Sequence, residues 1–106
     1  MADAAILVLT QMPDRASAQA LARRLVEGRL AACVSVGAPV ESLYHWRGQI
    51  ETAQEVPVAV KTRPERYPEV EAAIRAQHPY ELPEIVAVPV IGGLAPYLAW
   101  VAAETQ

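Results

Sequence analysis

The segment from His78 to Glu84 holds the side chains best suited to chemistry. It reads His-Pro-Tyr-Glu-Leu-Pro-Glu, so an imidazole, a phenol and two carboxylates fall within seven residues. Its two prolines fix their own φ and restrict the residue before each, which stiffens the backbone. A stiff loop with several polar groups is a common place for a ligand site. A solvated connector that ends a helix with a histidine has the same composition, and on composition alone that is the simpler interpretation.

Four further side chains could join such a site, namely Cys33, Lys61, Tyr67 and Trp100. Cys33 is the only cysteine and lies in an apolar stretch, where a free thiol is usually inert core. Lys61 is the only lysine, so it could meet an anion or pair with Glu81 or Glu84. A structural ion pair is the simpler role for it.

A metal site is a second candidate chemistry. Cys33, His78 and Glu81 are predicted ligands, with Met12 and His45 as further soft or imidazole donors of the kind copper or zinc accepts. No His-x-x-x-His or Cys-x-x-Cys spacing preassembles a site within one element. Distant segments, or several subunits, would have to converge. No motif requires a cofactor, and copper or another divalent metal is the candidate ligand.

The evidence for an enzyme is weaker. The sequence has no nucleophile elbow, phosphate-binding loop or dinucleotide fingerprint. A cluster of Lys61, His78 and Glu81 could transfer protons, but such clusters are equally common as ion-pair networks.

Hydrophobic periodicity predicts the elements that position these residues. Four strands are expected: residues 5–10, residues 30–46 with an interruption at 37–39, a return strand that carries Val56, Val58 and Val60 and ends at residues 61–62, and residues 85–91. Helices are expected between Asp14 and Gly28, from about Pro64 to His78, and from Pro96 onward. Arg47-Gly48-Gln49 is a hairpin-turn signal, and Thr62 with Glu65 has the spacing of a capping box. The order predicts an α+β fold, a ferredoxin-like β-α-β-β-α-β sandwich with an extra C-terminal helix, as one domain over residues 1–106.

The hairpin that contains residues 30–46 is too long for a domain of this size. Fully extended, it would run about 55 Å at about 3.3 Å per residue. A domain of this length is only about 35 Å across. The hairpin must bend at residues 37–39 or project, unless it coils strongly and folds back on itself. We expect Leu43, Tyr44 and Trp46 to be buried by a neighbouring subunit, with Tyr44 and Trp46 as interface residues.

Charge and composition exclude several classes. The net charge is −3 with no basic run, which argues against nucleic-acid or membrane-surface partners. No apolar stretch approaches the roughly 20 residues of a membrane span. The N-terminus lacks the basic region of a signal peptide. A single cysteine allows no internal disulfide and predicts a cytoplasmic protein.

Five segments together resemble the CutA divalent-cation tolerance family. They are residues 25–34 (LVEGRLAACV), 44–50 (YHWRGQI), 60–63 (VKTR), 78–85 (HPYELPEI) and 97–100 (YLAW). The resemblance implies a ferredoxin-like fold and a tight homotrimer built like the PII signal-transduction proteins. It also implies a role in tolerance of divalent metals, copper above all, and no settled molecular mechanism.

The resemblance implies functional residues only at the positions of this sequence that match the family pattern. Residues on the family pattern are Cys33, Trp46, Lys61, Tyr67, His78, Tyr80, Glu81, Glu84 and Trp100. Met12 stands where many members have a cysteine, and a thioether is a poor copper(II) ligand. We therefore expect a trimeric, non-catalytic module that takes a metal ion or a small anionic ligand, with Lys61 and His78 facing one cleft at a subunit boundary. The alternative is an enzyme of unassigned activity using Lys61, His78 and Glu81 at that boundary.

Overall fold

The computed structural model describes residues 4–106, so the first three residues of the predicted domain lie outside the described part. The elements follow the predicted order. They are β1 (Ala5–Met12), α1 (Arg15–Glu27), β2 (Cys33–Val36), β3 (Val40–Trp46), β4 (Gln49–Thr62), a 3₁₀ turn (Pro64–Arg66), α2 (Tyr67–Gln77), β5 (Ile85–Val90) and α3 (Ala95–Glu104).

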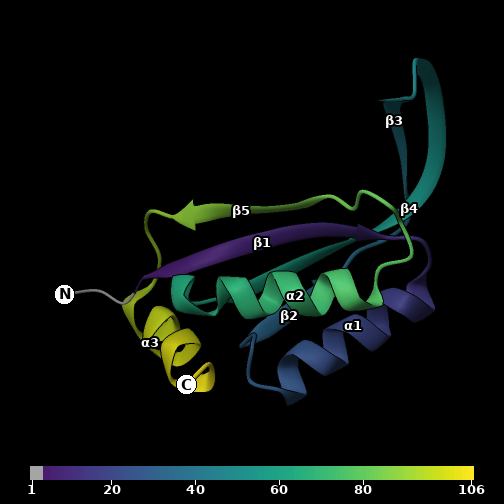
Figure 1. Ribbon diagram of the computed structural model, residues 1–106. Coiled ribbons are helices and arrows are strands. Elements are labelled where there is room, and N and C mark those ends of the chain that lie inside the picture. Colours follow the sequence, from purple (N-terminus) through teal and green to yellow (C-terminus); the bar gives the residue numbers. More distant parts are fainter. Residues whose placement is uncertain (1–3) are drawn as a thin grey trace.

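All the strands belong to one antiparallel sheet (Figure 1). The order across the sheet is β2-β4-β1-β5, and β3 pairs with the far half of β4. Strand β4 lies between β1 and β2, and β1 lies between β4 and β5. Each β-α-β unit is therefore split by a strand from the other, which is the ferredoxin-like arrangement that the order of elements predicts.

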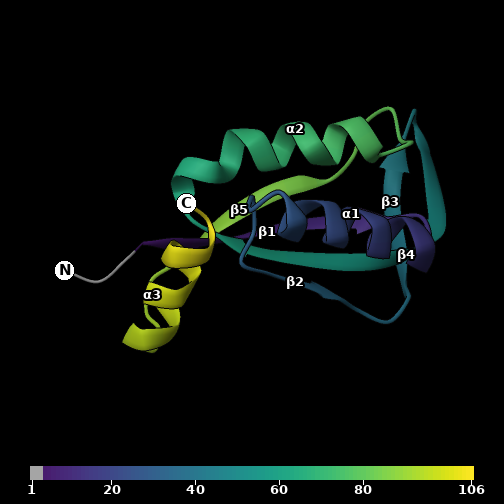
Figure 2. The same cartoon turned by 90° about the horizontal axis from the view of Figure 1, so that it is seen from below.

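The core lies between one face of this sheet and helices α1 and α2. Figure 2, seen from the helix side, shows the two helices next to each other in front of the strands. The register places Val8 opposite Val60 and Met12 opposite Val56. These side chains are buried with Leu21 and Leu25 of α1 and with Val70 and Ile74 of α2. Removing this apolar surface from water, at about 25 cal/mol per Å², is the main force that holds the helices on the sheet.

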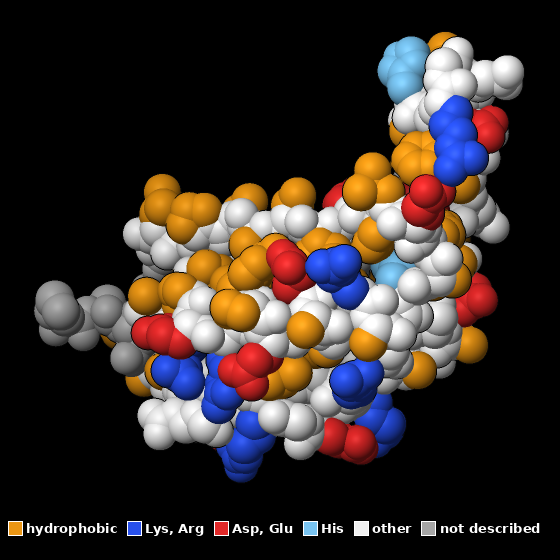
Figure 3. Space-filling view, in the orientation of Figure 1, with side chains coloured by type: hydrophobic (Ala, Val, Ile, Leu, Met, Phe, Trp, Pro, Cys, Tyr) orange, Lys and Arg blue, Asp and Glu red, His pale blue; other side chains and the backbone are white. Residues whose placement is uncertain are grey.

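The opposite face of the sheet is apolar but only partly covered. Its middle and edge strands present Leu7, Leu9, Val86, Val88 and Val90, and the three valines are 37–47% exposed. We call these five residues the open face. Figure 3 shows hydrophobic side chains gathered along the side where β5 runs. A contiguous apolar surface of this kind marks an interaction site more often than a solvated surface.

Residues 40–55 form an arm that rises from the body of the molecule (Figure 1). The strand is interrupted at Gly37, whose N–H donates to the Pro57 carbonyl at 2.9 Å. A Cβ on Gly37 would come within 2.8 Å of the Pro57 ring, so only glycine fits there. The molecule measures 47 Å in its long direction against 26 and 24 Å. The predicted projection is confirmed, and the folded-back hairpin is wrong.

The tip of the arm is the predicted tight turn. Arg47 has φ +50° and Gly48 has φ +79°, and Trp46 pairs with Gln49 across them. Two successive residues with positive φ are typical of a type I′ turn, whose twist matches that of the flanking strands. Near this tip the apolar Leu43 and Ile50 are 64% and 68% exposed.

Two local predictions are wrong. Thr62 does not cap the helix, because its buried hydroxyl donates to the Leu30 carbonyl at 2.6 Å and Arg63 occupies the cap position without a side-chain hydrogen bond. The strand predicted from Leu30 begins only at Cys33. The N–H groups of Leu30 and Ala31 both donate to the Leu25 carbonyl and close the end of α1 instead. In both cases a polar group near the end of a helix makes a hydrogen bond other than the one that sequence spacing predicts.

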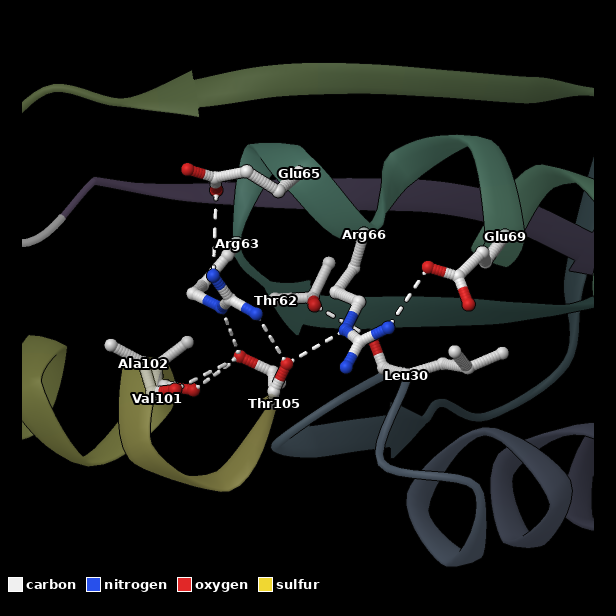
Figure 4. A network of polar contacts seen from close by, with 9 residues as sticks. All are labelled: Leu30, Thr62, Arg63, Glu65, Arg66, Glu69, Val101, Ala102 and Thr105. Atoms are coloured by element: carbon white, nitrogen blue, oxygen red, sulfur yellow. Dashed lines mark hydrogen bonds and ion pairs between the residues drawn. The ribbon is translucent and has the colours of Figure 1, made fainter.

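Two arginines at the start of α2 hold the C-terminal end of α3 (Figure 4). The Thr105 carbonyl accepts from Arg63 Nη2 at 2.6 Å and from Arg66 Nε at 2.7 Å. Arg63 Nε also donates to the Thr105 hydroxyl at 3.0 Å, and that hydroxyl donates to the Val101 carbonyl. Positive charge at the C-terminal end of a helix also complements the helix dipole. This contact supplements the small cluster of Ala5, Leu98 and Val101 beneath α3.

We therefore expect Arg63→Met to loosen α3. The change removes charge-assisted hydrogen bonds to a partly buried carbonyl and hydroxyl, which contribute about 2 kcal/mol together. Urea unfolding should report that loss, and amide exchange should rise first in α3. The matched control is Arg23→Met, whose ion pair with Glu27 is 78% and 65% exposed and contributes little. Equal stability of the two variants would contradict the stabilising role of Arg63 at the end of α3.

Candidate functional site

A groove of about 750 Å³ lies between the arm and the loop that follows α2. The inner side of β3 supplies Ser42, Tyr44 and Trp46, with Leu43 at the edge. Glu55 of β4 and residues 80–84 of the loop complete the lining. The arm can form one wall because β4 continues beyond the body of the sheet and carries β3 with it.

His78 fastens the loop to the body. It is buried, and its Nε2 lies 2.6 Å from the Gln11 carbonyl oxygen, while its Nδ1 accepts from the Tyr80 N–H at 3.2 Å. A carbonyl can only accept, so Nε2 carries the proton and Nδ1 does not. The Tyr80 ring lies 4.5 Å from the imidazole, centroid to centroid. Both ring nitrogens are thus used within the chain, and the histidine shapes the groove from behind.

Tyr80 and Glu55 face each other in the groove. Burial is the larger cause that raises the pKa of the Tyr80 phenol, followed by the Glu55 carboxylate and then by Tyr44. Glu55 is only 8% exposed, and within residues 4–106 no basic side chain lies at ion-pair distance from it. The groove therefore contains a desolvated carboxylate whose neighbour is a phenol rather than a cation.

Arg47 joins the tip of the arm to the loop. Its Nη2 lies 2.7 Å from Glu81 Oε2, and its guanidinium lies 5.3 Å from the centre of the Trp46 ring. Both charged side chains of the pair are 70% exposed, so the pair adds little stability. It neutralises Glu81, and Glu55 and Glu84 are left as the carboxylates of the groove without an ion pair in the described part of the chain.

The structure brings together some of the predicted site residues and separates others. Tyr80, Glu81 and Glu84 share the groove with Tyr44 and Trp46, above His78. Lys61 lies elsewhere, on the face of the sheet opposite the core, in register with Leu7 on one side and Cys33 on the other.

The two remaining candidates also lie outside the groove. Tyr67 opens α2 and donates to Glu71 at 2.8 Å, and that hydrogen bond is the main cause that raises the pKa of Tyr67. Trp100 lies on α3, with its ring 5.5 Å from that of Tyr97. Within this chain, Tyr67 and Trp100 therefore belong to helix surfaces.

The described residues of this chain do not form a group that fits a metal ion. Between residues 4 and 106 no three Cys, His, Asp or Glu side chains come together in a group that could hold one. Cys33, His78 and Glu81 lie on the sheet face, behind the loop and in an ion pair, respectively. Lys61, His78 and Glu81 are likewise apart, so one protomer does not assemble the proton-transfer cluster of the enzyme alternative.

Sequence reasoning missed Glu55 and Arg47. Glu55 is the last polar residue before the apolar alternation of β4 and is typical there of a solvated strand end. The alternation of side chains along the strand could have indicated its orientation. Residues 55, 57, 59 and 61 all point away from the core helices. Arg47 gave only a turn signal, because its contact with Glu81 spans 34 positions of sequence.

Comparison with known proteins identifies the family. The family model described as "CutA1 divalent ion tolerance protein" matches residues 6–104. A "Divalent-cation tolerance protein CutA" of Pectobacterium atrosepticum is 40% identical over 102 residues, which cover 96% of this chain and 93% of that protein. The solved divalent cation tolerance protein of Thermus thermophilus superposes with a TM-score of 0.94 at 38% identity, covering 96% of this chain and 99% of the other. The structure from Archaeoglobus fulgidus, called a periplasmic divalent cation tolerance protein, has a TM-score of 0.93 at 36% identity, covering 96% and 99%.

Titration of Tyr80 tests the geometry of the groove. Because its folded pKa is raised, the stability linked to Tyr80 is fully present below about pH 10, the unfolded value, and is lost as the pH rises through the folded value. The difference in ultraviolet absorbance between the wild type and Tyr80→Phe should show a phenol that ionises above the ordinary range. Glu55→Gln should lower that pKa only in part, since burial remains. A Tyr80 that titrates normally would contradict the arrangement.

Proposed function

Because this chain belongs to the CutA1 divalent ion tolerance family, we propose that it acts in divalent-cation tolerance as a homotrimeric, PII-like module. The observation that carries this proposal is the open face. Helices α1 and α2 cover only the other side of the sheet. The open face leaves Val86, Val88 and Val90 exposed side by side on an edge strand.

The arm supports the same proposal. Leu43 and Ile50 point to the side of the arm opposite Tyr44 and Trp46, and they are its most exposed apolar side chains. The valines of the open face and these two arm residues remain exposed within the described part of the chain. A stable protein interface buries about 1,200–2,000 Å² in total, which an apolar sheet face together with a projecting hairpin can supply. Tyr44 and Trp46 would then lie where the arm meets a neighbour, so that the groove opens at a subunit boundary.

The proposed role is that of a module that responds to a ligand. No catalytic role is assigned, because the residues of the enzyme alternative, Lys61, His78 and Glu81, lie apart in this chain. The single protomer also lacks a metal site among its described residues, so tolerance would not come from metal buffering by isolated chains. The described residues include no helix long and apolar enough to cross a membrane. We place the protein in the cytoplasm because of its single cysteine, although the name of the archaeal relative carries the word periplasmic.

A matched pair of valine variants tests the association. Val88 on the open face and Val26 on α1 are 41% and 44% exposed, so the same change can be made on two surfaces of equal accessibility. Sedimentation at micromolar concentration should show a trimer for the wild type and for Val26→Asp. Val88→Asp should dissociate, because its carboxylate would be buried among apolar side chains. A monomeric wild type, or equal behaviour of the two variants, would refute the proposal.

Copper titration tests the role of His78. Both of its ring nitrogens are engaged inside the chain, so calorimetry should give the same copper(II) affinity for the wild type and for His78→Ala. The exposed His45 provides the control, since His45→Ala removes the other imidazole. A marked loss of affinity in His78→Ala alone, with its fold verified by circular dichroism, would restore the predicted metal site.

A further inference from the structure

Two charged side chains on the same face of β4 have no ionic partner among residues 4–106. Glu55 is 8% exposed and lines the groove. Lys61 is partly buried beside the open face, between Leu7 and Cys33. Among residues 4–106 neither takes part in an ion pair.

These two groups cannot pair within one protomer. Residues 55 and 61 point to the same side of β4 but are six positions apart. At about 3.3 Å per residue that separation is about 20 Å, far beyond the reach of two side chains toward each other.

Burying these two charges in an assembly costs free energy unless each of them meets an opposite charge. If another copy covers the open face, the Lys61 ammonium loses water while surrounded by apolar and thiol groups, and a buried charge without a partner is strongly destabilising. Glu55 is already desolvated, and its neighbour in the groove is the neutral Tyr80 phenol rather than a cation. Each charge is the complement that the other lacks.

We propose that Lys61 of one copy enters the groove of the next copy and pairs there with Glu55, beside the Tyr80 hydroxyl. This inference rests on the self-association proposed above. It adds one specific contact, which sets how each copy is oriented against the next. The two groups lie about 20 Å apart on each copy, so the contact joins two different surfaces and is head-to-tail, and a head-to-tail contact closes only as a ring. In a ring of three, every copy donates one lysine and receives one, and each groove is completed by its neighbour.

The composition of the groove favours a lysine from outside. Arg47 already neutralises Glu81, so the remaining negative charge of the lining lies at the buried Glu55 and the exposed Glu84. Lys61 is the only lysine of the chain, and its long stem can lie along apolar side chains while its ammonium reaches a carboxylate. The completed site would combine an ammonium, a carboxylate and a phenol at each subunit boundary.

Charge exchange tests this pairing. Lys61→Glu and Glu55→Lys should each weaken association by about 30-fold or more per contact, since each places like charges together in a desolvated site. The double variant Lys61→Glu/Glu55→Lys restores opposite charges at every contact and should recover most of the wild-type affinity. Arg75→Glu on α2 and Glu27→Lys on α1 change the same charges at exposed positions of the two helices and should sediment like the wild type.

The outcomes distinguish the Lys61–Glu55 pairing from the self-association on which it rests. A monomeric wild type overturns both. A trimeric wild type with Lys61→Glu equally trimeric, or a double variant no better than the two single variants, overturns the pairing alone. Circular dichroism checks that each variant folds. If Lys61→Glu does not fold, Lys61→Met replaces it, because methionine keeps the apolar stem and removes the charge. Wild-type affinity in Lys61→Met overturns the pairing.

Discussion

Strand β4 is the element on which the rest of the structure depends. Its fourteen residues pair with β1 and β2 in the body and with β3 in the arm. An extended run of that length reaches about 46 Å, which is well beyond the 26 and 24 Å short dimensions of the molecule. A strand this long must project, and its projection creates one wall of the groove. The same strand carries Glu55 near the groove and Lys61 on the body, so it sets the distance between them.

The second constraint is the number of helices. Two helices cover one face of the sheet, and α3 packs at its end through Ala5, Leu98 and Val101 rather than across the other face. A chain of this size buries only about two-thirds of its unfolded surface, so an uncovered apolar face is a substantial share of what remains. In the proposed trimer, association of copies through that face would supply the missing layer. The groove would then depend on assembly, because its outer side would open where the arm meets a neighbour.

The sequence predicted the fold more completely than the site, for physical reasons. Elements follow from local periodicity, as in the alternation of Val56, Val58 and Val60 and the tight turn at Arg47-Gly48. The arm followed from a length argument. Contacts near helix ends could not be predicted in this way. The Thr62 hydroxyl donates to the Leu30 carbonyl, 32 positions away, and does not cap the helix that follows it. Likewise, the loop residues Tyr80, Glu81 and Glu84 share a groove as neighbours in sequence. The separation of Lys61 from His78 depends instead on the tertiary fold, because Lys61 lies opposite Leu7 whereas His78 bonds to Gln11 of the same strand.

The most direct test of the account is a crystal structure of the assembled protein, examined for the side chains of the open face. The account predicts that Leu7, Leu9, Val86, Val88 and Val90 are buried against other copies in a closed trimer. In that trimer, α1 and α2 should remain on the outside. An assembly formed through the helices, with the open face left in solvent, would contradict it.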